Sequence, residues 1–211
     1  GGIHVACATF FVFSDYMKPA FRLSALMQMP VKYIWTHDAF RVGEDGPTHQ
    51  PIEHEAQLRL LEKMQNHAGK MSMLALRPAD AAETSVAWKM AMENTETPTA
   101  LVLSRQNIND LPAATDRYTE ALKAEKGAYI VQKNGENPKV ILIASGSGHP
   151  DRCRQVVTRK KRYRFTGCIS YFGRFIPSAA DRLPGRSHSG LYASFRPDRR
   201  FIGNSGRIGR M

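Results

Sequence analysis

The sequence is poor in the features that mark several classes of protein. Its 211 residues include only three cysteines and two tryptophans, and no run of about 18 apolar residues that would predict a membrane span. Cys7, Cys153 and Cys168 are too few and too scattered for a disulfide framework or a zinc site. The first residues do not resemble a signal peptide. We therefore expect a reduced, cytoplasmic setting and no membrane partner.

Acidic residues are also scarce, and their scarcity is local. The chain has 30 Lys and Arg against 19 Asp and Glu, a net charge of +11 and a pI of about 9.8. Residues 1–147 contain 15 basic and 16 acidic residues, whereas residues 148–211 contain 15 basic and three acidic residues, a net charge of +12. A basic excess is typical of nucleic-acid binders. Here it belongs only to the last part of the chain.

The near-neutral part alternates apolar runs with helical periods. We predict strands at 5–13, 31–35, 71–76, 99–103, 127–132 and 140–144, and helices at 16–27, 51–65 and 80–93. Ser14 and Asp15 are the expected N-terminal caps of the first helix, and Asp80 that of the third, with Glu83 at the capping-box position. Near-continuous apolar strands separated by helices predict an α/β fold with a parallel sheet flanked by helices.

Polar motifs follow the predicted strands. His37 ends the second strand, Asp45 and His49 lie in the turn-rich loop after it, and Arg105 follows the fourth strand. Because ligands of open α/β sheets bind beyond the carboxyl ends of the strands, a site is expected there.

Taken singly, several of these residues have simpler explanations. Phe10 and Phe13 are typical of a buried strand, His37 of a strand end, and Arg105 of an exposed or ion-paired arginine. Glu53, His54, His67 and Trp88 are assigned to a helix surface or to the core.

Five motifs in one order carry a family resemblance. They are ATFFVFSDY at 8–16, THD at 36–38, GEDGPTHQPIE at 43–53, RPAD at 77–80 and SRQN at 104–107. Together they resemble transketolase over about residues 1–147. The resemblance implies a partial pyrimidine-binding domain at 1–112 that lacks its first elements, a linker at 113–126, the first strands of the family's C-terminal domain at 127–147, and a basic tail at 148–211.

The resemblance also implies a function for the intact protein. Transketolases transfer a two-carbon ketol unit from a ketose phosphate to an aldose phosphate in the pentose phosphate pathway. They work as homodimers with thiamine diphosphate and a divalent metal, Mg or Ca. Sugar phosphates are thus the expected partners, and nucleic acid is not.

Roles for individual residues follow from the same resemblance. Phe10, Phe13 and Tyr16 match residues that surround the aminopyrimidine ring of the cofactor. The substrate-binding residues that match are His37 and His49, which contact phosphate or hydroxyl groups, Asp45, which contacts a hydroxyl, and Arg105, which binds phosphate. General chemistry agrees, because aromatic faces suit a flat ring and a guanidinium matches a phosphate.

We expect this chain alone to be inactive. In the family, the glutamate that activates the cofactor lies upstream of the position that matches Gly1, and the preceding domain holds the diphosphate and the metal. We find no substitute glutamate in residues 1–15. An alternative is a natural split transketolase, in which a partner chain supplies the diphosphate site.

Two hypotheses account for residues 148–211. One is a non-enzymatic basic module that binds nucleic acid or another anion, since Lys and Arg neutralise phosphates. The other is a frameshift. Allowed codons for residues 170–190, translated one nucleotide later, permit AISEGLFRPQPTDYQEEVIPA, which resembles the transketolase C-terminal domain. We favour the frameshift and expect a tail without a native fold.

The nucleotide sequence of the gene tests the frameshift. We expect the shifted frame beyond the codon for Ser147 to stay open and to encode transketolase-like sequence. Early stop codons in that frame would contradict the hypothesis, as would homologous proteins that carry this same basic tail.

Overall fold

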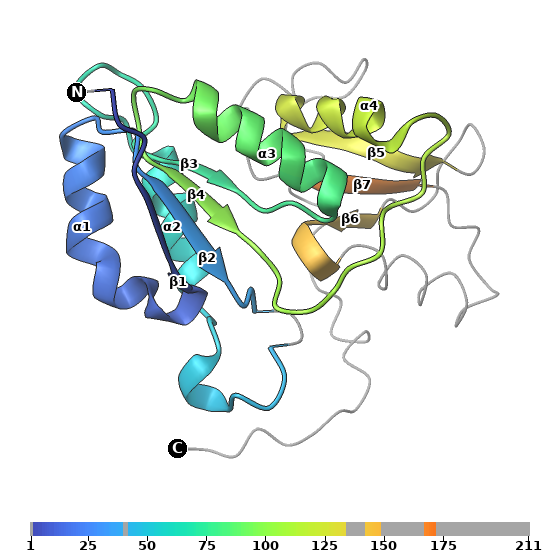
Figure 1. The fold of residues 1–211 in the computed structure, drawn as a ribbon, viewed down its shortest axis with the longest axis horizontal. Coiled ribbons are helices and arrows are strands. Elements are labelled where there is room, and N and C mark those ends of the chain that lie inside the picture. The colour runs from blue at the N-terminus through green and yellow to red at the C-terminus, as the bar shows by residue number, and fades with distance from the viewer. Residues whose placement is uncertain (1, 40–41, 134–141, 149–166, 172–211) are drawn as a thin grey trace, which may run out of the picture. The chain divides into compact units, whose positions relative to one another are not determined.

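The computed structural model describes residues 2–39, 42–133, 142–148 and 167–171. The chain divides into two compact units, Gly1–Phe175 and Ile176–Met211, of which the second lies outside the described residues. The first unit contains a four-stranded sheet with its helices and a three-stranded sheet (Figure 1).

The four-stranded sheet is parallel throughout. Its strands are β1 (Ala6–Phe10), β2 (Lys32–Thr36), β3 (Leu74–Leu76) and β4 (Thr99–Val102), in the spatial order β1-β2-β4-β3. The helices of this part are α1 (Ser14–Leu26), α2 (His54–Lys63) and α3 (Ala81–Glu93). The predicted fold class, a parallel sheet flanked by helices, is confirmed.

Both faces of this sheet are buried, as expected for a parallel sheet. On one face Leu74, Leu76 and Leu101 pack with residues of α3. On the other face Trp35, Met73 and Val102 pack with residues of α1 and α2. Because neighbouring residues of a strand point to opposite faces, both hydrophobic clusters come from the same short strands.

The ends of the predicted elements differ in detail from the observed ones. The first strand stops at Phe10, and Phe11–Phe13 form a 3₁₀ turn, η1, that leads directly into α1. The predicted caps of α1 are wrong, because the helix begins without a side-chain cap. Asp80 does cap α3, since its Oδ1 accepts a hydrogen bond of 2.8 Å from the Glu83 backbone N–H.

A second set of elements follows the parallel sheet. They are α4 (Arg117–Ala121), the 3₁₀ segments η3 (Leu122–Lys126) and η4 (Gly146–Gly148), and the strands β5 (Ala128–Lys133), β6 (Leu142–Ala144) and β7 (Gly167–Tyr171). The spatial order is β5-β7-β6, with β7 antiparallel to β5 and parallel to β6. The proposed domain boundaries at residues 112, 126 and 147 stay predictions.

Strand β7 belongs to the basic segment that the sequence predicts to be without a native fold. Its five residues pair with β5 and β6, and the expectation that the segment lacks a native fold stays a prediction. Residues 149–166 and 172–211 lie outside the described residues. They make up most of the segment for which a nucleic-acid-binding module and a frameshift were the two hypotheses.

A buried ionic network joins α4 to α3 and β5. The Arg117 guanidinium donates to Asp80 Oδ2 at 2.6 Å, to Glu83 Oε1 at 3.3 Å and to the Tyr129 hydroxyl at 2.6 Å. The Tyr129 hydroxyl donates to Glu83 Oε1 at 2.6 Å. Burial, and then the neighbouring Glu83 carboxylate, raise the pKa of Tyr129 well above its ordinary value, so the phenol keeps its proton.

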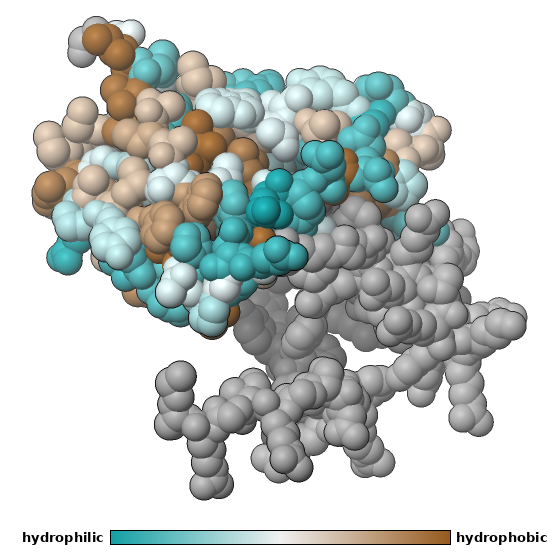
Figure 2. All heavy atoms as spheres, turned by 60° about the horizontal axis from the view of Figure 1, so that its bottom comes forward, coloured by the Kyte–Doolittle hydropathy of each residue, from teal (hydrophilic) through white to brown (hydrophobic). Residues whose placement is uncertain are grey.

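Exposed apolar side chains gather on the side of this unit that carries β1 and α1 (Figure 2). Strand β1 is an edge of its sheet. The exposed apolar residues there are Ile3, Val5, Tyr16, Leu23, Leu26, Met27 and Met29. Within the described residues no helix is long and apolar enough to cross a membrane.

The Arg117 network predicts a large loss of stability when the guanidinium is removed. Arg117→Met leaves the buried carboxylates of Asp80 and Glu83 without their cation, and breaking such a pair typically costs about 3–5 kcal/mol. We expect chemical denaturation to show a fall of that size in the free energy of unfolding. Lys70→Met, which breaks only an exposed pair with Glu96, should leave the transition nearly unchanged.

Candidate functional site

The candidate site lies where the strands of the four-stranded sheet end. Because β1, β2 and β4 are parallel, the residues that follow them meet at one edge of the sheet. The turn η1 follows β1, the loop with the 3₁₀ turn η2 (Pro47–His49) follows β2, and Arg105 lies just beyond β4. In Figure 1 the segment carrying η2 extends beyond the ends of β1 and β2.

Aromatic rings form a continuous cluster at this edge. The Phe10 ring stacks on the His37 imidazole with centroids 3.8 Å apart, and on the Phe13 ring with centroids 5.8 Å apart. Phe13 contacts Tyr16 at 6.0 Å and meets His49 edge-on at 5.2 Å. Tyr16 is 84% exposed, so one end of the cluster is open to a ligand. A flat heteroaromatic ring would find both faces and edges here.

Charged groups lie beside these rings. Asp45 Oδ2 is 3.5 Å from Arg105 Nε and 4.0 Å from His37 Nε2. This oxygen is buried and has no hydrogen-bond partner within the part of the chain that the structure describes. A buried carboxylate oxygen without a donor is costly, and a ligand hydroxyl would satisfy it. The arrangement therefore leaves room for one hydroxyl donor of a ligand beside Arg105 and His37.

The Arg105 side chain is held close to the loop backbone. A side chain at Gly43 would place its Cβ 3.3 Å from an Arg105 guanidinium nitrogen, and the φ of Gly43 is +90°. Both the close approach and the left-handed backbone favour glycine at this position. Arg105 remains about half exposed, which leaves its donors available for an anion.

The backbone holds His37 in an uncommon conformation. Its φ is +63°, and Thr36 Oγ1 lies 3.0 Å from His37 Nδ1. The next residue is fixed to the sheet, because the Asp38 N–H donates to the Leu103 carbonyl at 3.1 Å. Left-handed non-glycine residues cluster at functional sites, where the surroundings determine the conformation.

Asp38 and Arg77 are site-supporting residues to which the sequence analysis assigned no role. The buried Asp38 Oδ2 accepts hydrogen bonds from Arg77 at 3.0 Å and from Ser147 Oγ at 2.7 Å. Arg77 also donates to Glu55 at 2.7 Å. Asp38 and Arg77 both lie just after a strand, at the carboxyl ends of β2 and β3. The rule that polar residues after parallel strands belong to the site could therefore have identified both from the sequence.

Opposing influences act on the His37 imidazole. Burial lowers the pKa of His37, the Asp45 carboxylate raises it, and electrostatic interactions with Arg105 and His49 lower it. The net result is a pKa below the ordinary histidine value. His37 is therefore neutral at neutral pH and offers one donor and one acceptor nitrogen.

All seven predicted site residues lie in one connected set. Phe10, Phe13 and Tyr16 form the aromatic part, and Asp45 and Arg105 form the charged part. His37 and His49 contact the aromatic part, and His37 also faces Asp45. The binding role of each residue stays a prediction.

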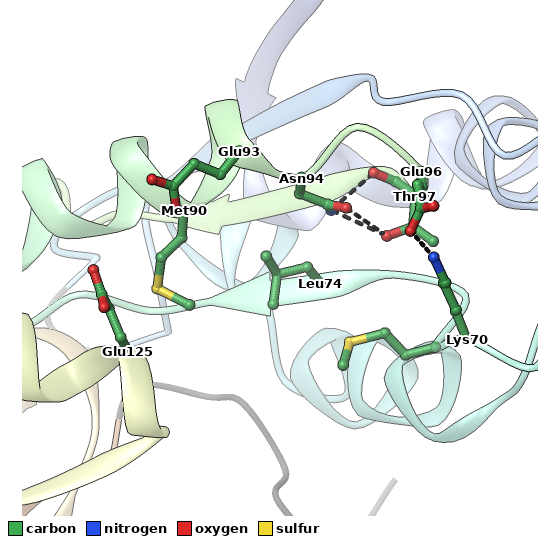
Figure 3. Close-up of a pocket in the computed structure, with 9 residues that line it drawn as sticks. Lys70, Leu74, Met90, Glu93, Asn94, Glu96, Thr97 and Glu125 are labelled. Atoms are coloured by element: carbon green, nitrogen blue, oxygen red, sulfur yellow. Dashed lines mark hydrogen bonds and ion pairs between the residues drawn. The ribbon is translucent and has the colours of Figure 1, made fainter.

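A separate pocket of about 480 Å³ lies at the opposite, amino end of β3 and β4 (Figure 3). Its lining includes Leu74 and Met90, and its polar side chains are largely engaged with one another. The Asn94 amide donates to Thr97, and Lys70 is paired with Glu96. This pocket contains none of the predicted site residues.

Comparison with known proteins agrees with the resemblance. Residues 1–110 match the family described as "Transketolase, pyrimidine binding domain". The transketolase of Bacillus subtilis is 52% identical over 149 residues, which are 70% of this chain and 20% of that protein.

Solved structures give the same picture. The transketolase of Pichia stipitis in complex with sedoheptulose 7-phosphate superposes with a TM-score of 0.66 at 36% identity, covering 79% of this chain and 22% of the other. The Campylobacter jejuni transketolase gives 0.60 at 38% identity, covering 79% and 24%. The chain thus spans about one fifth of the length of the proteins that it matches.

The charges around His37 predict how its pKa responds to substitution. Asp45→Asn removes the carboxylate that favours the imidazolium, so the pKa of His37 should fall further. Arg105→Gln removes a repelling cation and should raise it. An NMR titration of the His37 ring measures both effects. Glu96→Gln, which changes a carboxylate at the other end of the strands, should leave the titration unchanged.

Proposed function

This chain belongs to the transketolase family, and we propose that it forms the part of a transketolase active site that binds the cofactor's aminopyrimidine ring and the sugar-phosphate substrates. The observation that carries the proposal is the contact between an aromatic cluster and a charged cluster at the carboxyl edge of one parallel sheet. Since the chain matches about one fifth of its relatives, the activity belongs to the longer protein.

Phe10, Phe13 and Tyr16 would hold the aminopyrimidine ring. Their rings form a stacked and tilted series that is open at Tyr16, which fits a planar ligand. Thiamine diphosphate, when bound, supplies the carbanion chemistry that ketol transfer needs. The side chains of this chain orient the ring and exclude water from one of its sides.

The charged cluster would bind the substrate. Arg105 offers a half-exposed guanidinium fork for the phosphate, and Asp45 offers an acceptor for a hydroxyl. His37 and His49 would donate to phosphate or hydroxyl oxygens, and a neutral His37 can also accept a proton. A sugar phosphate presents both kinds of group, and the Pichia stipitis transketolase forms a complex with one, sedoheptulose 7-phosphate.

The finer assignments are part of the same proposal. The intact protein would transfer a two-carbon ketol unit from a ketose phosphate to an aldose phosphate in the pentose phosphate pathway, as a cytoplasmic homodimer. Its cofactor would be thiamine diphosphate with Mg or Ca. The diphosphate and metal ligands would come from a region that this chain does not include.

The 211-residue chain by itself should not catalyse ketol transfer. The residues that we assign to the site bind and orient, and none of them is assigned the role of activating the cofactor. A coupled assay with xylulose 5-phosphate and ribose 5-phosphate, with thiamine diphosphate and Mg²⁺ added, should give no rate above background. A measurable rate from the purified chain would contradict this prediction.

The role of Arg105 can be tested in a chimera in which residues 1–147 replace the matching segment of the Bacillus subtilis transketolase. Arg105→Gln removes the guanidinium fork, so the KM for phosphorylated substrates should rise by about 10- to 100-fold, because a charge-assisted hydrogen bond is worth about 1.5–3 kcal/mol. Activity on non-phosphorylated sugars should change little.

Arg22→Gln, at an exposed arginine of α1, is the matched control. An equal loss with both kinds of sugar would contradict phosphate binding by Arg105.

A further inference from the structure

We propose that His54 and Glu53, with Asp15 holding the His54 ring in place, form a binding site for a divalent transition-metal ion of the Zn²⁺ type. The fold brings these residues together from two helices, since Asp15 lies in the first turn of α1 and Glu53 precedes His54 at the start of α2. One potential ligand atom from each residue lies within 4.8 Å of the others.

The hydrogen bonds of His54 determine which nitrogen is available. His54 Nε2 lies 3.0 Å from the Val12 carbonyl oxygen and 3.1 Å from Asp15 Oδ2. Both partners only accept hydrogen bonds, so Nε2 carries the proton. In a neutral imidazole Nδ1 then presents a lone pair.

This lone pair points at no hydrogen-bond donor in the part of the chain that the structure describes. The His54 side chain is only 3% exposed, and its Nδ1 has no hydrogen-bond partner among the described residues. The atom that it faces is Glu53 Oε2, another acceptor, at 3.8 Å. The buried Nδ1 thus faces a second acceptor and no donor, and a cation between the two atoms would satisfy both.

The surroundings of the imidazole match those of metal-binding histidines. A histidine that ligates a metal usually donates its other ring N–H to a backbone carbonyl or a carboxylate, which fixes the ring. Here the Val12 carbonyl and the Asp15 carboxylate do this at Nε2. The Phe11 ring, with its centroid 5.7 Å from the imidazole, packs against the same side chain.

The donor set selects the class of metal. One imidazole nitrogen with carboxylate oxygens suits Zn²⁺ and its neighbours, whereas Ca²⁺ and Mg²⁺ prefer oxygen ligands alone. Zn–N and Zn–O bonds of about 2.0–2.2 Å bridge two atoms 3.8 Å apart without moving the backbone. The Glu53 side chain is 61% exposed, so it can turn toward the ion and leave the other positions of the ion to water, while Asp15 stays bound to Nε2.

Binding at this site would fix His54 of α2, which contacts Asp15 of α1 through Nε2, and these two helices cover one face of the parallel sheet. An ion that binds only the folded chain raises its stability in proportion to the logarithm of the ion concentration. The site would therefore show itself as a rise in melting temperature with added Zn²⁺.

The test uses the full 211-residue chain and ZnCl₂. Titration calorimetry, and elemental analysis after dialysis, should each show one Zn²⁺ bound per chain at this site. The melting temperature of the chain should be higher with Zn²⁺ than without it. Both His54→Gln and Glu53→Gln should weaken this binding by at least tenfold. Glu53 is exposed, so Glu53→Gln should fold normally, as far-UV circular dichroism will show. His67→Gln, at an exposed histidine beyond α2, is the matched control.

Three outcomes would overturn the proposal. One is a wild-type chain that takes up no Zn²⁺ at micromolar concentration. Another is binding that survives either His54→Gln or Glu53→Gln unchanged. The third is an equal loss in His67→Gln.

Discussion

A buried ion pair between Asp38 and Arg77 joins the carboxyl ends of β2 and β3, and the candidate site is built on this contact. Asp38 also binds Ser147 through its side chain and the Leu103 carbonyl, beyond β4, through its backbone N–H. Separating the two partners would leave an uncompensated buried charge, so the contact holds the carboxyl ends of β2 and β3 in place. His37 precedes Asp38 and is thereby held in its left-handed conformation against the Phe10 ring.

The same ion pair demands a small residue at a distant position. A Cβ at Gly146 would lie 2.6 Å from Arg77 Nε, and the φ of Gly146 is +59°. Glycine alone meets both conditions without strain. The turn Ser145-Gly146-Ser147 thus packs directly on Arg77, which Ser145 also approaches at 3.5 Å. One arginine therefore connects the parallel sheet to the turn that follows β6.

Packing and binding share residues in the aromatic cluster. On sequence grounds alone, Phe10 and Phe13 are core residues of a strand that extends to residue 13. In the structure the strand stops at Phe10 and the 3₁₀ turn η1 follows, so Phe13 lies beside His49 and Tyr16 and outside the hydrophobic clusters of the sheet. Phe11, in the middle, is the residue that enters the core. Hydrophobicity cannot distinguish these three phenylalanines, because only the backbone bend separates them.

The sequence by itself determined the α/β class, the approximate helices and strands, and the family, because apolar periodicity and local motifs depend on residues close together in the chain. It also placed His37, Asp45 and Arg105 after strands, and parallel pairing then brought them to one edge. It did not predict that Asp38 pairs with Arg77, that Arg117 joins Asp80 and Glu83, or that His54 lies between Asp15 and Glu53. Those contacts join residues separated by more than 30 positions, except for the adjacent Glu53. Only the tertiary structure decides them, because burial and distance are properties of the packed chain.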